Sequence, residues 1–261
     1  MATLPRLYTL ENLSSAREVE LSGNQAHYLA RVMRLTVGDQ IRVFNSSDGE
    51  WLAEVSAIKS KRVFFKPVEQ RRKPLVESQT GPVLIFAPLK KSRTDFVIEK
   101  ATEMGAAEIH PVITDRTQTK TVRTDRLVSL SVEAAEQTER MDVPEISDAK
   151  TLRSAINNFN GHVFFCDEAG DNAQDVWGGE SGRAPGFAEI GVSDAGKTRT
   201  GILVGPEGGF SPDEREWLRS LDFVTPITLG PRILRAETAV VAALTIWQAL
   251  AGDWRQAPRE N

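Results

Sequence analysis

Two stretches of the sequence combine residue types that could do chemistry. In LGPRILRAETA (229–239), Arg232 and Arg235 directly precede a run of small apolar residues. Two guanidiniums at the mouth of a ligand crevice suit an anion, or a reaction in which negative charge develops on oxygen. In the alternative interpretation, Arg232 and Arg235 pair with Glu237 or with a carboxylate such as Glu207 and only brace the loop.

The second stretch, GPEGGFSPDE (205–214), brings three glycines together, and glycines permit close approach of the backbone to a ligand. Ser211 followed by Pro212 and Glu214 predicts the start of a helix. The sequence contains neither G-x-G-x-x-G nor G-x-x-x-x-G-K-[ST], so ordinary dinucleotide and P-loop sites lose their main support. The alternative is a tight strand-to-helix turn that binds nothing.

The elements that position these stretches alternate between strand and helix. From Pro82 onward, apolar runs alternate with helical patterns, the clearest of which begins at Ser92 and ends at Gly105. This pattern predicts an α/β fold with a mainly parallel sheet. Such sheets bind ligands beyond the carboxyl ends of their strands, where CDE (166–168) also lies. The five predicted strands cover 83–87, 108–113, 162–166, 201–204 and 224–229.

The front of the chain has a different pattern. Three strand-like runs within 40–70 predict a small β-barrel or curled sheet. Upstream, Ser22 and Gln25 form a capping pattern, and helical spacing predicts that Ala26, Leu29, Ala30 and Met33 face the core. His27, Arg31 and Arg34 then share the other face. Together with the basic run at 59–73, this face is a plausible surface for nucleic acid, although most charge runs are simply solvated.

Composition separates the two parts of the chain. Residues 1–80 hold 12 Lys and Arg against 9 Asp and Glu, whereas residues 81–261 hold 20 against 27. The polar stretch 71–82 separates the two patterns, and we predict one domain at 1–73 and a second at 74–261. Residues 168–200 have no clear period and are predicted to form a flexible insertion.

Several classes of protein are disfavoured. The one cysteine, Cys166, allows no internal disulfide, and the absence of a leader sequence indicates the cytoplasm. His27, His110 and His162 stand far apart, so we expect no metal site. The longest apolar stretch, Ala239 to Ala251, is too short to span a bilayer and predicts a covered helix.

Five motifs, in order along nearly the whole chain, closely resemble the RsmE family of SPOUT-class rRNA methyltransferases. The motifs lie at 27–51, 89–117, 133–144, 203–214 and 229–244. The resemblance implies S-adenosylmethionine as methyl donor and N3 of a uridine in small-subunit (16S) ribosomal RNA as the target. It also implies a PUA-like barrel at 1–73, a SPOUT domain with a deep trefoil knot at 74–261, a homodimer, and the assembled 30S particle as substrate.

In that chemistry, loss of the N3 proton puts negative charge on O2 and O4 of uracil, which Arg232 or Arg235 could stabilise. Glu207 or Glu237 could accept the proton, and water is the alternative. The cofactor would be held by Leu203, Val204, Gly205, Pro206, Glu207, Gly208, Gly209, Leu229, Gly230, Ile233 and Leu234. RNA would contact Arg6, His27, Arg31, Arg34, Lys61, Arg62, Arg71 and Arg72.

Two other functions stay open at this point. A non-catalytic, dimeric RNA-binding or ribosome assembly factor would explain the basic front equally well, but it has no evident need for both the glycine and the arginine motifs. An enzyme that binds a nucleoside phosphate would use the arginines to hold the anion, and it would bind ATP or GTP in preference to a sulfonium nucleoside.

Overall fold

The computed structural model describes residues 4–13, 17–59, 62–74, 81–167, 184–190 and 199–255. The chain divides into two compact units, which are described separately. Unit 1 comprises Met1–Ser78 and Val132–Val143, and unit 2 comprises Gln79–Ser131 and Pro144–Asn261. Unit 1 thus includes a segment from the stretch that the sequence pattern placed wholly in the second domain.

Unit 1 is a curled sheet around a small apolar core. The strand order is β1-β3-β4-β5-β2, in which β1 runs parallel to β3 and the other pairs are antiparallel. Irregularities in the pairing of β4 with β5 bend the sheet, as bulges do, and confirm the small β domain predicted from the alternating pattern. The strands are β1 (Arg6–Tyr8), β2 (Val19–Leu21), β3 (Gln40–Asn45), β4 (Gly49–Lys59) and β5 (Arg62–Arg72).

The predicted helix of unit 1 is shorter and less regular than expected. Helix α1 (Gly23–His27) continues into a π-helical turn at Tyr28–Val32. The capping prediction was wrong, because Ser22 makes no side-chain cap and the Gln25 amide donates instead to the Tyr8 carbonyl at 2.7 Å. Leu29 is fully buried as predicted, but Met33 is 38% exposed.

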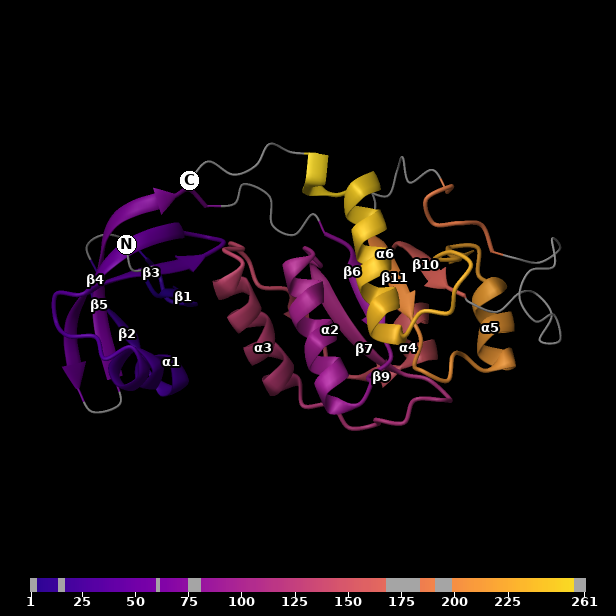
Figure 1. Ribbon diagram of the computed structural model, residues 1–261, viewed down its shortest axis with the longest axis horizontal. Helices are drawn as coiled ribbons and strands as arrows, with labels where there is room; N and C mark the ends of the chain where they lie inside the picture. Colours follow the sequence, from indigo (N-terminus) through magenta and orange to yellow (C-terminus); the bar gives the residue numbers. More distant parts are fainter. Residues whose placement is uncertain are drawn as a thin grey trace. The chain divides into compact units, whose positions relative to one another are not determined.

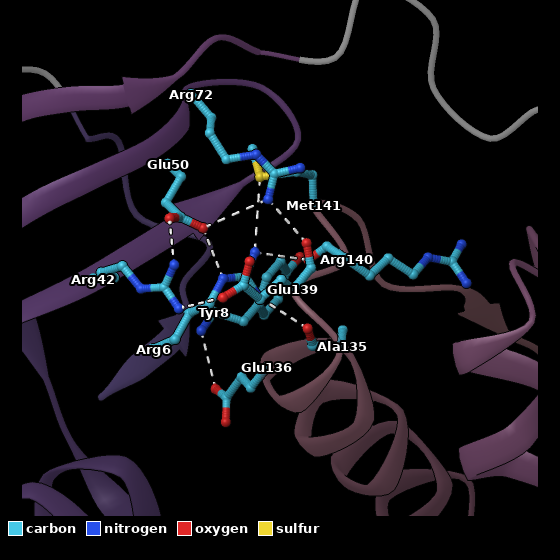
Figure 2. Close-up of polar contacts among 10 residues, drawn as sticks. All are labelled: Arg6, Tyr8, Arg42, Glu50, Arg72, Ala135, Glu136, Glu139, Arg140 and Met141. Atoms are coloured by element: carbon cyan, nitrogen blue, oxygen red, sulfur yellow. Dashed lines mark hydrogen bonds and ion pairs between the residues drawn. The ribbon is translucent and has the colours of Figure 1, made fainter. Parts of the chain in front are cut away.

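The 132–143 segment packs onto the barrel through apolar and polar contacts. Phe44 of β3 packs against Ala135 and Met141. The Arg6 guanidinium lies over the Phe44 ring. It donates to the carbonyls of Ala135, at 2.8 Å, and Arg140, at 2.9 Å (Figure 2). These contacts explain why the segment belongs to unit 1.

Unit 2 is an α/β structure around a parallel sheet, as predicted. Its strand order is β12-β10-β11-β6-β7-β8, with β9 also paired to β7, and each pair is parallel. Each predicted strand is present within two residues of its expected ends, whereas β8 and β9 were not predicted. The strands are β6 (Val83–Phe86), β7 (Glu108–Ile113), β8 (Glu145–Ile146), β9 (Lys150–Thr151), β10 (His162–Cys166), β11 (Thr200–Val204) and β12 (Val224–Ile227).

Helices cover both faces of this sheet, because alternate strand residues feed two separate apolar clusters. Leu84 and Phe86 of β6 pack with α2 and α6, which lie side by side in Figure 1, whereas Val83 and Ile85 pack with α4 and α5. The helices are α2 (Lys91–Glu103), α3 (Thr124–Gln137), α4 (Leu152–Asn157), α5 (Pro212–Arg219) and α6 (Ala236–Leu250), followed by a 3-10 turn at Asp253–Arg255. Helix α3 belongs to unit 2 up to Ser131 and to unit 1 from Val132. Among the described residues, no helix is long and apolar enough to cross a membrane.

The predicted flexible insertion at 168–200 was wrong for residues 184–190. Phe187 is 1% exposed and packs against Phe164 with ring centroids 4.9 Å apart. Its backbone N–H donates to the Thr228 carbonyl, and the Thr228 N–H donates to the carbonyl of Pro185. Burial of the Phe187 ring fixes this part of the connection against the sheet. Residues 168–183 and 191–198 lie outside the described residues.

Candidate functional site

A cavity of about 510 Å³ opens in unit 2 at the carboxyl ends of three neighbouring strands, β10, β11 and β12. This is where parallel sheets bind their ligands, and all three segments predicted for it contribute to the lining. The cavity is lined by Arg93, Arg116, Cys166, Asp167, Val204 to Phe210, Pro212, Arg215, Ile227 to Gly230, Arg232 to Ala236, and Ala239.

The glycine loop after β11 depends on the absence of side chains. A Cβ on Gly205 would lie 2.6 Å from the ring of Phe210, which is buried and packs edge-on against Phe165. Gly209 has a φ of +66°, in the left-handed region that favours glycine. The Arg116 guanidinium donates to the Gly208 carbonyl at 2.8 Å, so the turn is held from outside the loop.

Helix α5 begins directly after this loop with the predicted cap. The Ser211 hydroxyl accepts from the Glu214 N–H, and the Glu214 carboxylate accepts from the Ser211 N–H at 2.9 Å. The same carboxylate accepts from the Asp115 N–H, and the Ser211 hydroxyl donates to the Asp115 carboxylate at 2.6 Å. The cap therefore connects the glycine loop to the end of β7.

The second loop presents two arginines that form no ion pair with any described residue. Gly230 has a φ of +110°, which turns the chain after β12. Arg232 is exposed, and Arg235 is the N-cap of α6. Neither guanidinium lies within ion-pair distance of a carboxylate in the described part of the chain. The bracing role that we held open for these arginines is therefore absent among those residues.

The carboxylates of Glu207 and Glu237 interact with Arg93 of α2 instead. Its Nη1 donates to Glu207 Oε1 at 3.3 Å, and its Nε lies 3.6 Å from Glu237 Oε1. Glu237 Oε2 is buried and has no hydrogen-bond partner among the described residues. Arg93 was not among the predicted site residues, although it lies in one of the motifs that carried the resemblance. Its partners stand more than a hundred positions away, so no local pattern reveals the bridge.

Asp167 forms a buried ion pair in the lining. Arg215 donates to both carboxylate oxygens, at 2.9 and 3.2 Å, and the Nε of Arg219 donates at 2.9 Å. The aspartate thus ties the end of β10 to α5. The only signal for it in the sequence was the position of CDE after a predicted strand.

The cavity includes each residue predicted to hold a cofactor except Leu203. Leu203 is fully buried in the cluster that contains Val83 and Ile85, because alternation along β11 points it to the other face of the sheet. The three predicted catalytic residues, Arg232, Arg235 and Glu207, all line the cavity. The two loops predicted from the sequence therefore line one cavity, and their roles stay predictions.

The predicted RNA-binding residues do not share one environment. Arg6 is 7% exposed and pairs with Glu50 at 2.7 Å, so its assignment to RNA was wrong; its charge is used within the fold (Figure 2). Burial lowers the pKa of the Arg6 guanidinium, and the Glu50 carboxylate opposes that shift. Arg72 is half-buried and donates to the Glu139 carbonyl at 2.9 Å.

The remaining candidates differ in their partners. Arg62 lies 3.3 Å from Glu20, and Arg71 lies 3.0 Å from Glu69. Lys61 lies outside the described residues. Among these candidates, the exposed basic side chains without an ion pair to a described residue are His27, Arg31 and Arg34.

Comparison with known proteins gives consistent results. Residues 77–248 match a family described as RNA methyltransferase domain, and residues 21–68 match one described as RNA methyltransferase PUA domain. Ribosomal RNA small subunit methyltransferase E of Rickettsia conorii is 34% identical over 240 residues, which cover 92% of this chain and 93% of the relative. The Bacillus subtilis protein of the same name is 28% identical over 250 residues, which cover 91% and 92%.

A solved structure has the same fold. A methyltransferase from Legionella pneumophila, in complex with the bound cofactor SAM, has a TM-score of 0.76 at 25% identity, over 95% of this chain and 98% of that one.

Proposed function

The chain belongs to the RNA methyltransferase family that includes ribosomal RNA small subunit methyltransferase E, and from this premise we propose that it methylates N3 of a uridine in 16S ribosomal RNA with S-adenosylmethionine. The observation that carries the proposal is the single cavity formed by the glycine loop and the arginine loop. A scaffold that only binds RNA has no need to bring these loops together at the carboxyl edge of a sheet.

The residues of the cavity fit S-adenosylmethionine. Its volume lies in the usual range for small-molecule sites, and the exposed backbone around Gly205, Gly208 and Gly230 can meet adenosine and methionine by shape and hydrogen bonds. The bound cofactor supplies an electrophilic sulfonium methyl group. The protein has to hold donor and acceptor in line, and such positioning contributes roughly 7–11 kcal/mol in favourable cases.

The methyl acceptor, uracil N3, depends on side chains of the protein for its activation. Uracil N3 must lose a proton before it attacks the methyl carbon, and the negative charge then spreads onto O2 and O4. Arg232 and Arg235, which line the cavity without an ion pair to any described residue, are available to stabilise that charge. Glu207 at the same cavity could take the proton, with Arg93 beside it, and water is the alternative.

Three finer features belong to the proposal. We expect the substrate to be the assembled 30S particle and the enzyme to be a homodimer, as the resemblance implies. We also expect the deep trefoil knot. Its support is that the chain after β12, at the edge of the sheet, returns to pack α6 against α2 and β11, and so builds the cavity from two separated loops.

The first test is calorimetric titration of the full chain with S-adenosylmethionine, S-adenosylhomocysteine and ATP. We expect saturable binding of the two sulfur nucleosides and no binding of ATP. Gly205→Ala should abolish this binding, because the added Cβ collides with Phe210. Binding of ATP alone would indicate the nucleoside-phosphate enzyme instead.

The second test measures methyl transfer to 30S particles that lack the modification, with mass spectrometry to locate the methyl group. Arg235→Ala should keep cofactor binding and lower kcat by about 100- to 1,000-fold, as loss of one charge-stabilising donor does. A protein that binds particles but transfers no methyl group would be an assembly factor.

A further inference from the structure

The π-helical turn of unit 1 moves apolar side chains out of the barrel core. In a regular helix Met33 would lie on the face of Ala26, two turns away. Instead, the Met33 N–H donates to the Tyr28 carbonyl at 2.9 Å, five residues back, and the Leu35 N–H donates to Leu29 at 3.0 Å. The wider turn rotates the residue that follows it, so Met33 reaches the surface; Val32, within the turn, is exposed as well.

These side chains form a concentrated apolar surface. Ten large hydrophobic residues of the described chain are exposed, and four of them fall within 28–37: Tyr28 (40%), Val32 (60%), Met33 (38%) and Val37 (63%). Single exposed hydrophobics are normal, but four within ten residues of one another, in and just after a π-helical turn, indicate an interaction surface. The side chain of Tyr28 makes no hydrogen bond or ring contact with any described residue, so its ring is available.

Within residues 22–38 the charged side chains are basic, whereas the carboxylates of Asp39 and Glu136, which lie against this stretch, accept hydrogen bonds from Thr36 and Gln25. His27, Arg31 and Arg34 are exposed and are unpaired among the described residues, and the sequence from Ser22 to Gly38 contains no Asp or Glu. Arg34 has a φ of +56°, a costly conformation for a residue other than glycine, and such strain gathers at functional sites. A negatively charged partner therefore fits this surface better than an apolar protein face does.

An aromatic ring, aliphatic neighbours and unpaired arginines together match single-stranded nucleic acid. Unpaired bases stack on aromatic side chains, and arginines meet the adjacent phosphates; in a duplex the base faces are covered. We propose that Tyr28 stacks on an unpaired base of the substrate RNA, other than the base that is methylated, while Arg31 and Arg34 contact the flanking phosphates. The inference rests on the proposed function, because it requires an RNA substrate.

The test measures binding of the full chain to a fluorescent single-stranded RNA of about 12 nucleotides and to its duplex, by anisotropy. We expect the single strand to bind more tightly than the duplex. Tyr28→Ala should weaken single-strand binding about 10-fold, the effect of one stacked base, whereas Tyr28→Phe should keep it. Arg31→Gln should reduce the slope of the logarithm of the binding constant against the logarithm of the salt concentration by about one.

Val68→Ala is the control, because Val68 is 50% exposed in the same unit but lies outside the 28–37 surface. With 30S particles, Tyr28→Ala should raise KM about 10-fold and leave kcat within twofold. Equal binding of single strand and duplex, or unchanged binding in Tyr28→Ala, would overturn the stacking role and indicate another partner. Absence of methyl transfer in the wild type would instead overturn the proposed function.

Discussion

At the scale of single residues, Arg93 holds two carboxylates beside the cavity. It donates to Glu207 and approaches Glu237, whose second oxygen is buried without a partner among the described residues. If Arg93 is removed, both carboxylates lose their cation, and their negative charge opposes the charge that develops on the substrate. The orientation of the glycine loop is affected as well.

We therefore expect Arg93→Ala to lower kcat by up to about 100-fold, the effect of misplacing a reacting group. Arg93→Lys should recover part of this loss, because a single ammonium can reach only one of the two carboxylates well. Steady-state kinetics with 30S particles measures the effect. Arg123→Ala, an exposed arginine that pairs only with Asp125 in the described structure, is the control and should retain the wild-type kcat.

Arg6 stabilises the fold of unit 1 and is not exposed for contact with RNA. Its guanidinium and the Glu50 carboxylate are both almost completely buried, and Arg42 lies 3.2 Å from the same carboxylate. Removal of Arg6 takes away the buried cation nearest to the Glu50 carboxylate and leaves that buried charge to Arg42, which is more exposed. Arg6→Ala should lower the free energy of unfolding by about 3–5 kcal/mol.

Urea denaturation checks this expectation. The double variant Arg6→Met, Glu50→Leu removes both buried charges and should be less destabilised than Arg6→Ala alone. A loss below about 1 kcal/mol in Arg6→Ala would mean that the pair is effectively exposed to solvent.

At the scale of elements, the five predicted strands were found because a strand that is buried on both faces appears as a continuous apolar run. The two-residue strands β8 and β9 are too short to give any period. The packing of Phe187 was missed because one aromatic residue in a polar, glycine-rich stretch carries no pattern. The π-helical turn was missed because residues 26–33 have perfect α-helical spacing.

Of the candidate site, only the parts that carry a local sequence motif could be predicted. Both loops were found from local glycine, proline and arginine motifs, and the lining of the cavity agrees with them. The partners of Asp167 and Arg93 were not predictable, because the ion pairs join elements that are distant in the sequence.

The capping box of α5 is the element that joins the glycine loop to β7. Ser211→Ala removes the hydroxyl that caps the Glu214 N–H and donates to Asp115. We expect a loss of about 1 kcal/mol in stability, together with weaker binding of S-adenosylmethionine. Thermal unfolding and calorimetry measure the two effects, and Ser211→Thr should retain most of both. Unchanged cofactor affinity in Ser211→Ala would show that the loop is held without the cap.

At the scale of the whole molecule, the two units do not follow one another along the chain, because a segment from the middle of the sequence belongs to unit 1. Composition predicted one boundary, at 73/74, because a polar stretch separates two patterns there. It did not indicate that Val132–Val143 contributes to unit 1, since Ala135 is one apolar residue in a helix and Met141 one apolar residue in the connection after it.

Met141→Ala should therefore destabilise unit 1. Met141 is 4% exposed against Phe44, and truncation of a buried methionine costs about 2–5 kcal/mol. Hydrogen exchange should accelerate in β3 and β4, almost a hundred residues upstream, more than in β10 and β11. Equal acceleration in both sheets would indicate that the two units unfold together.

The contribution of residues 132–143 to unit 1 also has a consequence for biosynthesis. Domains generally fold as units while the chain emerges from the ribosome, the N-terminal domain first. Here, the five strands of the barrel are translated well before Met141, and until then Phe44 and Arg6 have neither their apolar cover nor their carbonyl acceptors. The first domain to be translated therefore completes its folding only after part of the second has been synthesised, and during that interval its incomplete core is open to chaperones and proteases.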